Sequence, residues 1–157
     1  MGFNKNIGTK IAVYSLVIGT LYAIFGVLEI LVGWGDLIGT GDPLIPPLEL
    51  AGVNVVPADV FGGVMLIIIG VVYLTGIKLQ TKGEREGLSF LFVGSLLALI
   101  FFAVYLAIMI SNGIGYVFQF EDWLEWIWID DLRPGIWLFL LASPGAYLAF
   151  TKKKWRG

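Results

Sequence analysis

The sequence predicts an all-α integral membrane protein, a bundle of four transmembrane helices with a short amphipathic interfacial helix before the last span. Three observations predict this fold. Only 14% of the 157 residues are charged, whereas a soluble domain carries about 25%. Long apolar runs recur along the chain without the period-two alternation of barrel strands. Basic residues gather beside these runs. We expect residues 1–157 to form a single membrane domain.

Four apolar runs are long enough to cross a bilayer, at residues 11–34, 60–79, 88–110 and 134–150. The first contains Glu29 as its only ionisable residue, and the second is interrupted only by Lys78. The third carries no charge. The fourth has 17 uncharged residues, which as a helix would reach about 26 Å and is adequate for a hydrocarbon core of about 30 Å.

The basic residues predict the orientation. Nine of the ten precede the first run, lie at the end of the second or between it and the third, or follow the fourth, and only Arg133 falls on the other side. Because cytoplasmic segments carry the excess of Lys and Arg, both termini are expected in the cytoplasm of a multi-pass protein of the cell membrane. The acidic residues are distributed in the opposite sense, with nine of the twelve in the two expected outer loops.

The two outer loops differ in their expected structure. Residues 35–59 contain four of the six prolines, so we expect an irregular connector, with a short hairpin about Ala51 and Gly52 as the alternative. Residues 116–132 place their apolar side chains on one face of a helical wheel, which predicts an amphipathic helix in the membrane interface. Tryptophan favours that depth, and the expected interfacial anchors are Trp123, Trp126, Trp128 and Trp155.

Pairs of glycines mark expected helix-packing faces. Gly19 and Gly26 lie seven residues apart in the first span, as do Gly63 and Gly70 in the second. Seven residues make about two helical turns, so each pair shares one face and allows a neighbouring backbone to approach closely.

Glu29 is the candidate intramembrane polar site, because a carboxylate there is costly to leave facing lipid. It is either a proton or cation site, or a boundary residue satisfied by tyrosine hydroxyls, backbone or water. The sequence suggests no intramembrane basic partner for it, apart from Lys78 near the opposite end. The outer carboxylates follow the topology and form no calcium-binding loop, so no metal site is expected.

The chain has no cysteine and no histidine, which excludes disulfides, thiolate or imidazole metal sites and Ser-His-Asp chemistry. No nucleotide-binding or nucleophile motif occurs, and no basic domain suggests nucleic acid. We therefore expect no enzyme activity and no cofactor.

The sequence favours a non-catalytic accessory or structural subunit of a membrane complex, whose partners are the lipid bilayer and other membrane subunits or a second copy. The alternative is a small ion or solute carrier or channel that uses Glu29. An enzyme acting on lipid ranks last.

Overall fold

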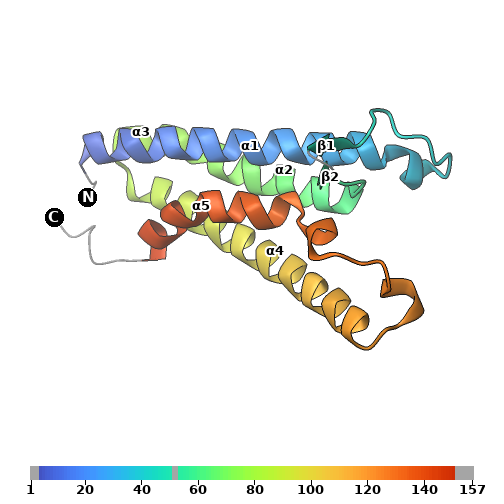
Figure 1. The fold of residues 1–157 in the computed structure, drawn as a ribbon. Helices are drawn as coiled ribbons and strands as arrows, with labels where there is room; N and C mark the ends of the chain where they lie inside the picture. Colours follow the sequence, from blue (N-terminus) through green and yellow to red (C-terminus); the bar gives the residue numbers. More distant parts are fainter. Residues whose placement is uncertain (1–3, 51–52, 151–157) are drawn as a thin grey trace.

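The computed structural model describes residues 4–50 and 53–150, which form an elongated bundle of helices (Figure 1). A first long helix is followed by a strand hairpin, an antiparallel return of two helices, a second long helix, two 3-10 turns and a last helix. In order these are α1 (Lys5–Ile38), β1 (Leu48–Leu50), β2 (Val53–Val56), α2 (Val60–Thr75), α3 (Ile77–Lys82), α4 (Arg85–Val117), η1 (Glu121–Trp123), η2 (Trp128–Asp131) and α5 (Pro134–Phe150).

Local sequence explains where the helices begin and end. The Asn4 side chain accepts a hydrogen bond from the Asn6 backbone at the start of α1, and Asp59 does the same for Gly62 at the start of α2. Gly39 ends α1 and Gly83 ends α3, both with a left-handed backbone that glycine adopts without strain. The bend at Gly83 reverses the chain into α4.

Three helical segments of the described chain are long and apolar enough to cross a membrane: Lys5–Ile38, Val60–Lys82 and Arg85–Val117. The last helix, α5, has 17 residues and runs antiparallel to α1. The Tyr14 hydroxyl donates to the Ala142 carbonyl at 2.7 Å, and Phe25, further along α1, packs edge-on against Trp137 with ring centroids 4.6 Å apart. These two contacts hold the middle of α5, from Trp137 to Ala142, against α1.

The glycine pairs lie in the contact between α1 and α2. A Cβ atom added to Gly26 would lie 2.5 Å from the carbonyl oxygen of Gly63, and one added to Gly19 would lie 3.0 Å from that of Gly70. The two helices therefore pack backbone against backbone, with each glycine facing a glycine of the antiparallel neighbour.

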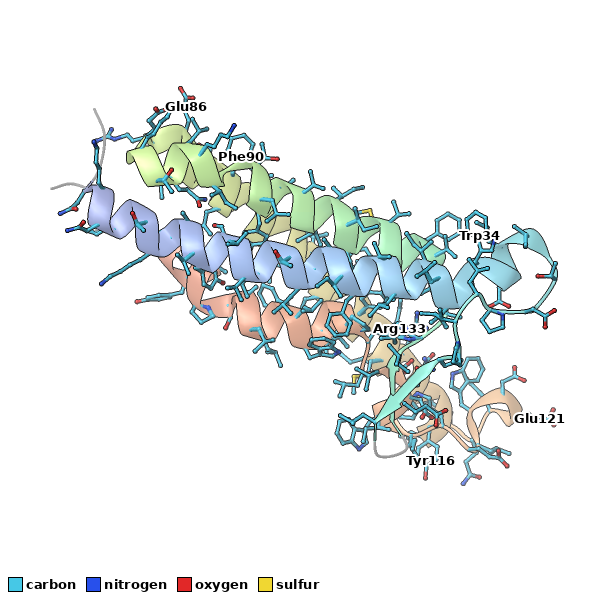
Figure 2. The ribbon with its side chains drawn as sticks, turned by 90° about the horizontal axis from the view of Figure 1, so that it is seen from above. Trp34, Glu86, Phe90, Tyr116, Glu121 and Arg133 are labelled. Carbon is cyan, nitrogen blue, oxygen red and sulfur yellow. The ribbon has the colours of Figure 1, made fainter. Side chains whose placement is uncertain are left out.

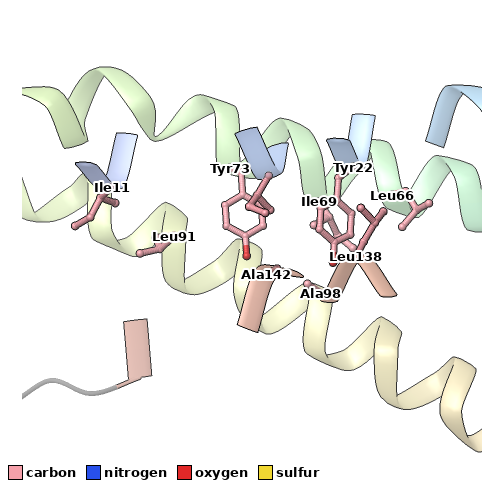
Figure 3. Close-up of a cluster of buried hydrophobic side chains, with 10 residues drawn as sticks. Ile11, Tyr22, Leu66, Ile69, Tyr73, Leu91, Ala98, Leu138 and Ala142 are labelled. Carbon is pink, nitrogen blue, oxygen red and sulfur yellow. The ribbon is translucent and has the colours of Figure 1, made fainter. Parts of the chain in front are cut away.

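Beneath this contact lies the apolar core (Figure 3). The rings of Tyr22 and Tyr73 stack with centroids 6.3 Å apart, and the Tyr73 and Ser95 hydroxyls form a hydrogen bond of 2.9 Å. Side chains from every long helix surround them, including Leu66, Ile69, Leu91, Ala98, Leu138 and Ala142.

The first loop contains the hairpin that was the alternative expectation. β1 and β2 pair antiparallel, with Leu50 opposite Val53 and Glu49 opposite Asn54. The prediction of an irregular connector is wrong over this stretch, because the alternation of apolar and polar residues on either side of Ala51 and Gly52 is enough to pair two short strands.

The predicted amphipathic helix at 116–132 is also wrong. Helix α4 continues to Val117, and Gln119 then adopts a left-handed backbone with φ of 55°, which a right-handed helix does not contain. Two 3-10 turns follow in place of one helix. An apolar face on a helical wheel does not by itself produce a helix. Here the indoles of Trp123 and Trp126 donate hydrogen bonds to Asn112 and Asp131, and these bonds stabilise a loop that folds back on the bundle.

Candidate functional site

Glu29 is completely buried in the bundle. Its side chain is 0% exposed, and neither carboxylate oxygen has a hydrogen-bond partner among the described residues. One helical turn further along α1, Gly33 packs against the backbone of Asp59 and Val60. Glu29 therefore lies about one turn deeper in the bundle than the start of α2.

Asp59 accepts three hydrogen bonds at the start of α2. One carboxylate oxygen accepts from the Gly62 backbone at 2.7 Å. The other accepts from the Tyr105 hydroxyl and from an Arg133 terminal nitrogen, both at 2.7 Å. The Asp59 carboxylate thus caps its own helix and links α2 to α4 and α5.

Arg133 directly precedes α5 and forms the ion pair with Asp59. Its guanidinium also lies over the Tyr105 ring, 5.4 Å from the centroid, a distance typical of a cation–π contact. Its Nε is buried and has no hydrogen-bond partner among the described residues. Figure 2 shows Arg133 where the helices meet the loops, at the end opposite to Glu86.

Glu29 and Arg133 both lie toward the hairpin end of the bundle. Phe25 contacts Trp137, Glu29 is one turn after Phe25, and Arg133 is one turn before Trp137. Arg133 reaches Asp59, whose backbone packs against Gly33, one helical turn after Glu29.

Four polar side chains thus lie near the hairpin end of the bundle. Two belong to α1 and α4, and the other two directly precede α2 and α5. We call them the four-helix polar cluster: Glu29, Asp59, Tyr105 and Arg133. Solvent exposure falls steeply across this cluster. The side chains of Arg133 and Asp59 are 29% and 18% exposed, whereas Glu29 is 0% exposed. The cluster combines two carboxylates, one guanidinium and one phenol.

An open groove of about 350 Å³ reaches the cluster from the hairpin end. Its lining includes Gly33, Asp36, Asp59 and Phe61. Asp59 therefore belongs both to the groove and to the cluster, whereas Glu29 does not line the groove.

Glu29 also continues a row of buried polar groups along one face of α1. Ser15, Tyr22 and Glu29 are seven residues apart and each is 0% exposed. Their polar side-chain atoms have no hydrogen-bond partner among the described residues. The row ends at the four-helix polar cluster, where the ionisable groups gather.

The tryptophans expected as interfacial anchors occupy different environments. The Trp123 indole donates to Asn112 at 3.1 Å and the Trp126 indole donates to Asp131 at 2.8 Å, so both join the second loop to the bundle. Trp128 is exposed, and Trp155 lies outside the described residues. No group of three or more residues in the described chain is suited to hold a metal ion.

Sequence reasoning found Glu29 but missed its neighbours. Asp59 was assigned to an outer loop, and Arg133 only to the charge count. One available signal was that Arg133 is the single basic residue on its side of the predicted membrane, directly before the proline that starts a span. The expectation that no intramembrane basic residue apart from Lys78 could pair with Glu29 stays a prediction, because Arg133 lies just outside a span and forms its ion pair with Asp59.

The sequence matches a known family over almost its whole length. The family described as the MJ0565 integral membrane domain matches residues 5–153. A protein of Methanocaldococcus jannaschii, named uncharacterized protein MJ0565, is 33% identical over 138 residues, which cover 88% of each chain. No solved structure matches. Together with the long apolar helices, this match confirms the predicted all-α integral membrane class. The chain therefore belongs to the MJ0565 integral membrane domain family.

Proposed function

We propose that this protein is a small ion carrier in which Glu29 binds the ion. The observation that carries the proposal is the burial of Glu29 without a partner: its side chain is fully buried, and its two oxygens have no hydrogen-bond partner among the described residues. It lies about one helical turn deeper than Asp59, which forms an ion pair with Arg133. An ionisable group at this depth is costly, and such groups mark ion and proton pathways in membrane proteins. The alternative of a boundary residue satisfied by tyrosine hydroxyls is less well supported, because the Tyr105 hydroxyl donates to Asp59 instead.

The groove supports access from the hairpin end. It is open, and its lining includes Asp36 and Asp59. Asp59 packs against Gly33, about one helical turn from the buried Glu29. Carboxylates at the mouth of such a groove attract cations and protons from water. An ion would pass Asp59 and Arg133 before it reaches Glu29.

The carrier we propose has four spans and both termini in the cytoplasm. The start of α1, the bend at Gly83 and the end of α5 lie at one end of the bundle, and the hairpin lies at the other (Figure 1). Lys5, Lys82 and Arg85 belong to the first of these ends, as expected for the cytoplasmic side. The alignment of α5 with α1 supports α5 as the fourth span.

Ion flux in liposomes tests the function. The purified chain is reconstituted with dyes for H⁺, Na⁺ or K⁺ inside, and an ion gradient is imposed. We expect the wild type to dissipate at least one gradient, and Glu29→Gln, which keeps the side-chain size, to fall to the rate of protein-free liposomes. Glu49→Gln is the matched control, because Glu49 is exposed on β1, and it should behave as the wild type. Equal flux in the wild type and in Glu29→Gln would exclude Glu29 as the ion site.

A role as a non-catalytic accessory subunit is the second candidate. It is supported by the second loop, which hydrogen bonds hold in a defined shape and which presents Phe120, Leu124, Ile127 and Trp128 on its surface. Aromatic side chains of this kind are enriched in interfaces. Under this proposal, native membranes in mild detergent yield a stoichiometric partner that Trp128→Ala loses and Leu44→Ala, an exposed change elsewhere, retains. A single monodisperse chain would count against it.

A further inference from the structure

We propose that the ion bound at Glu29 is a proton, and that the guanidinium of Arg133 competes with this proton for the Glu29 carboxylate. The inference rests on the proposed function and names its ion. The inference goes beyond the proposed function by assigning Arg133 the role of an internal counter-cation, which exchanges between the carboxylates of Asp59 and Glu29.

The first argument is the shortage of ligands for a metal cation. Hard cations take six or more oxygen ligands, and Glu29 supplies only two free oxygens. Both oxygens of Asp59 already accept hydrogen bonds, one from Gly62 and the other from Tyr105 and Arg133. The permanent positive charge of Arg133 would also repel a second cation. A proton needs one oxygen and no further ligand.

The second argument is the charge balance of the cluster. Asp59 from the start of α2 and Arg133 from the start of α5 cancel, and Tyr105 from α4 is neutral. On α1 the nearest titratable groups, Tyr22 and Asp36, are each two turns away from Glu29. With a proton on Glu29 the cluster is neutral, whereas without it one negative charge remains in a buried site, which is costly unless a cation compensates for it.

The third argument is that an unused donor and an unused acceptor lie in the same cluster. The Arg133 guanidinium has five N–H donors in a planar fork. A terminal nitrogen donates to Asp59, while the buried Nε has no partner. The two Glu29 oxygens are the complementary unpartnered acceptors. Buried groups of this kind are strongly driven to pair.

These three points describe two states. In the first, Arg133 pairs with Asp59, as the structure shows, and the proposal assigns a proton to one carboxylate oxygen of Glu29. In the second, that O–H bond breaks, the proton leaves through the groove past Asp59, and the guanidinium donates to the new carboxylate. The step is an acid–base exchange in which water at the mouth of the groove accepts the proton, so it needs no oxidant or reductant.

Infrared difference spectroscopy tests the inference directly. The chain is reconstituted in phosphatidylcholine liposomes and titrated with acid and base, first in a buffer free of metal cations. We expect the carbonyl band of a protonated carboxyl group that is present in the wild type and absent in Glu29→Gln. The midpoint of its titration should stay constant when Na⁺, K⁺ or Mg²⁺ is added at constant ionic strength. In Arg133→Gln the band should persist to higher pH, because ionised Glu29 loses its counter-cation. Glu49→Gln should titrate as the wild type.

The outcomes separate this inference from the function on which it rests. A midpoint that moves with the concentration of Na⁺ or K⁺, or Glu29-dependent flux of those ions alone, would overturn the proton assignment and leave the carrier standing. Absence of any Glu29-dependent ion flux would overturn the carrier itself. A band that titrates identically in Arg133→Gln would refute the competition. The titrations with added Na⁺, K⁺ or Mg²⁺ use the wild type, so they test the proton assignment even where a variant fails to fold.

Discussion

Asp59 shows how much structure one side chain can organise. Its carboxylate accepts hydrogen bonds from the Gly62 backbone, the Tyr105 hydroxyl and the Arg133 guanidinium, so it joins the start of α2 to α4 and α5. Charge-assisted hydrogen bonds are about twice as strong as neutral ones. Removing this one residue would leave a helix without its cap and a guanidinium without its counter-ion.

Substitution of Asp59 should therefore destabilise the protein far more than substitution of Tyr105. We expect Asp59→Ala to lower the free energy of unfolding by about 3–5 kcal/mol, as in other proteins that lose one partner of a largely buried ion pair. Tyr105→Phe removes one hydrogen bond and should cost about 1 kcal/mol. Thermal unfolding in detergent measures both, with Glu49→Gln as the neutral control. Equal losses in Asp59→Ala and Tyr105→Phe would contradict this account of the ion pair.

At the scale of elements, glycine brings α1 and α2 together. Gly19 and Gly26 face Gly70 and Gly63, so the two backbones touch where side chains would otherwise separate them. This close contact leaves the neighbouring face of α1, which carries Ser15, Tyr22 and Glu29, turned into the bundle. The spacing of seven residues is thus used twice on α1, once for packing and once for the buried polar row.

A methyl group in this contact should be costly. We expect Gly26→Ala to destabilise the protein by about 1–3 kcal/mol, typical of overpacking, because its Cβ would lie 2.5 Å from a backbone carbonyl oxygen that has no room to move. Gly113→Ala is the matched control on α4, where the nearest atom is 3.3 Å away in a side-chain ring. Midpoints of thermal unfolding compare the two, and a smaller loss in Gly26→Ala would rule out the glycine contact as a close-packed interface.

Helix α5 contains Pro144, and neighbouring side chains satisfy the backbone around it. Proline cannot donate to the Leu140 carbonyl, and the Ser143 hydroxyl donates to that carbonyl at 2.8 Å instead. The Tyr14 hydroxyl of α1 accepts from the Gly145 backbone at 3.1 Å and donates to the Ala142 carbonyl. The irregular point of α5 is therefore also a point of attachment to α1.

At the scale of the whole molecule, the position of α5 determines the topology. With four spans, the start and the end of the chain lie on the same side of the membrane, and with three they lie on opposite sides. The 17 residues of α5 reach about 26 Å, slightly less than a typical hydrocarbon core, which local thinning accommodates at modest cost.

Single cysteines test the topology, since the natural chain has none. We expect Asp42→Cys, in the loop before the hairpin, to react with a membrane-impermeant thiol reagent from outside the cell. Glu86→Cys, at the opposite end of the bundle, should react only after the membrane is opened. Lys153→Cys lies outside the described residues and should behave like Glu86→Cys if α5 is a span. Labelling of Lys153→Cys together with Asp42→Cys would show three spans.

The sequence by itself determined the membrane class, the positions of the long helices and the isolated carboxylate at Glu29. These follow from hydropathy, run length and charge, which are local properties of each segment and do not depend on the segments packed against it. It did not predict the second loop, where Gln119 leaves the helix and two indoles find partners in Asn112 and Asp131.

Only the tertiary structure decided what surrounds Glu29. Asp59 meets Tyr105 and Arg133 across 46 and 74 residues of sequence, and no local pattern encodes contacts over such separations. They depend on how α2, α4 and α5 pack around α1, and so on the glycine contacts and the attachment of α5. The physical reason is that burial and hydrophobicity place a helix in the membrane, whereas the partner of a buried charge is chosen by the geometry of all the helices together.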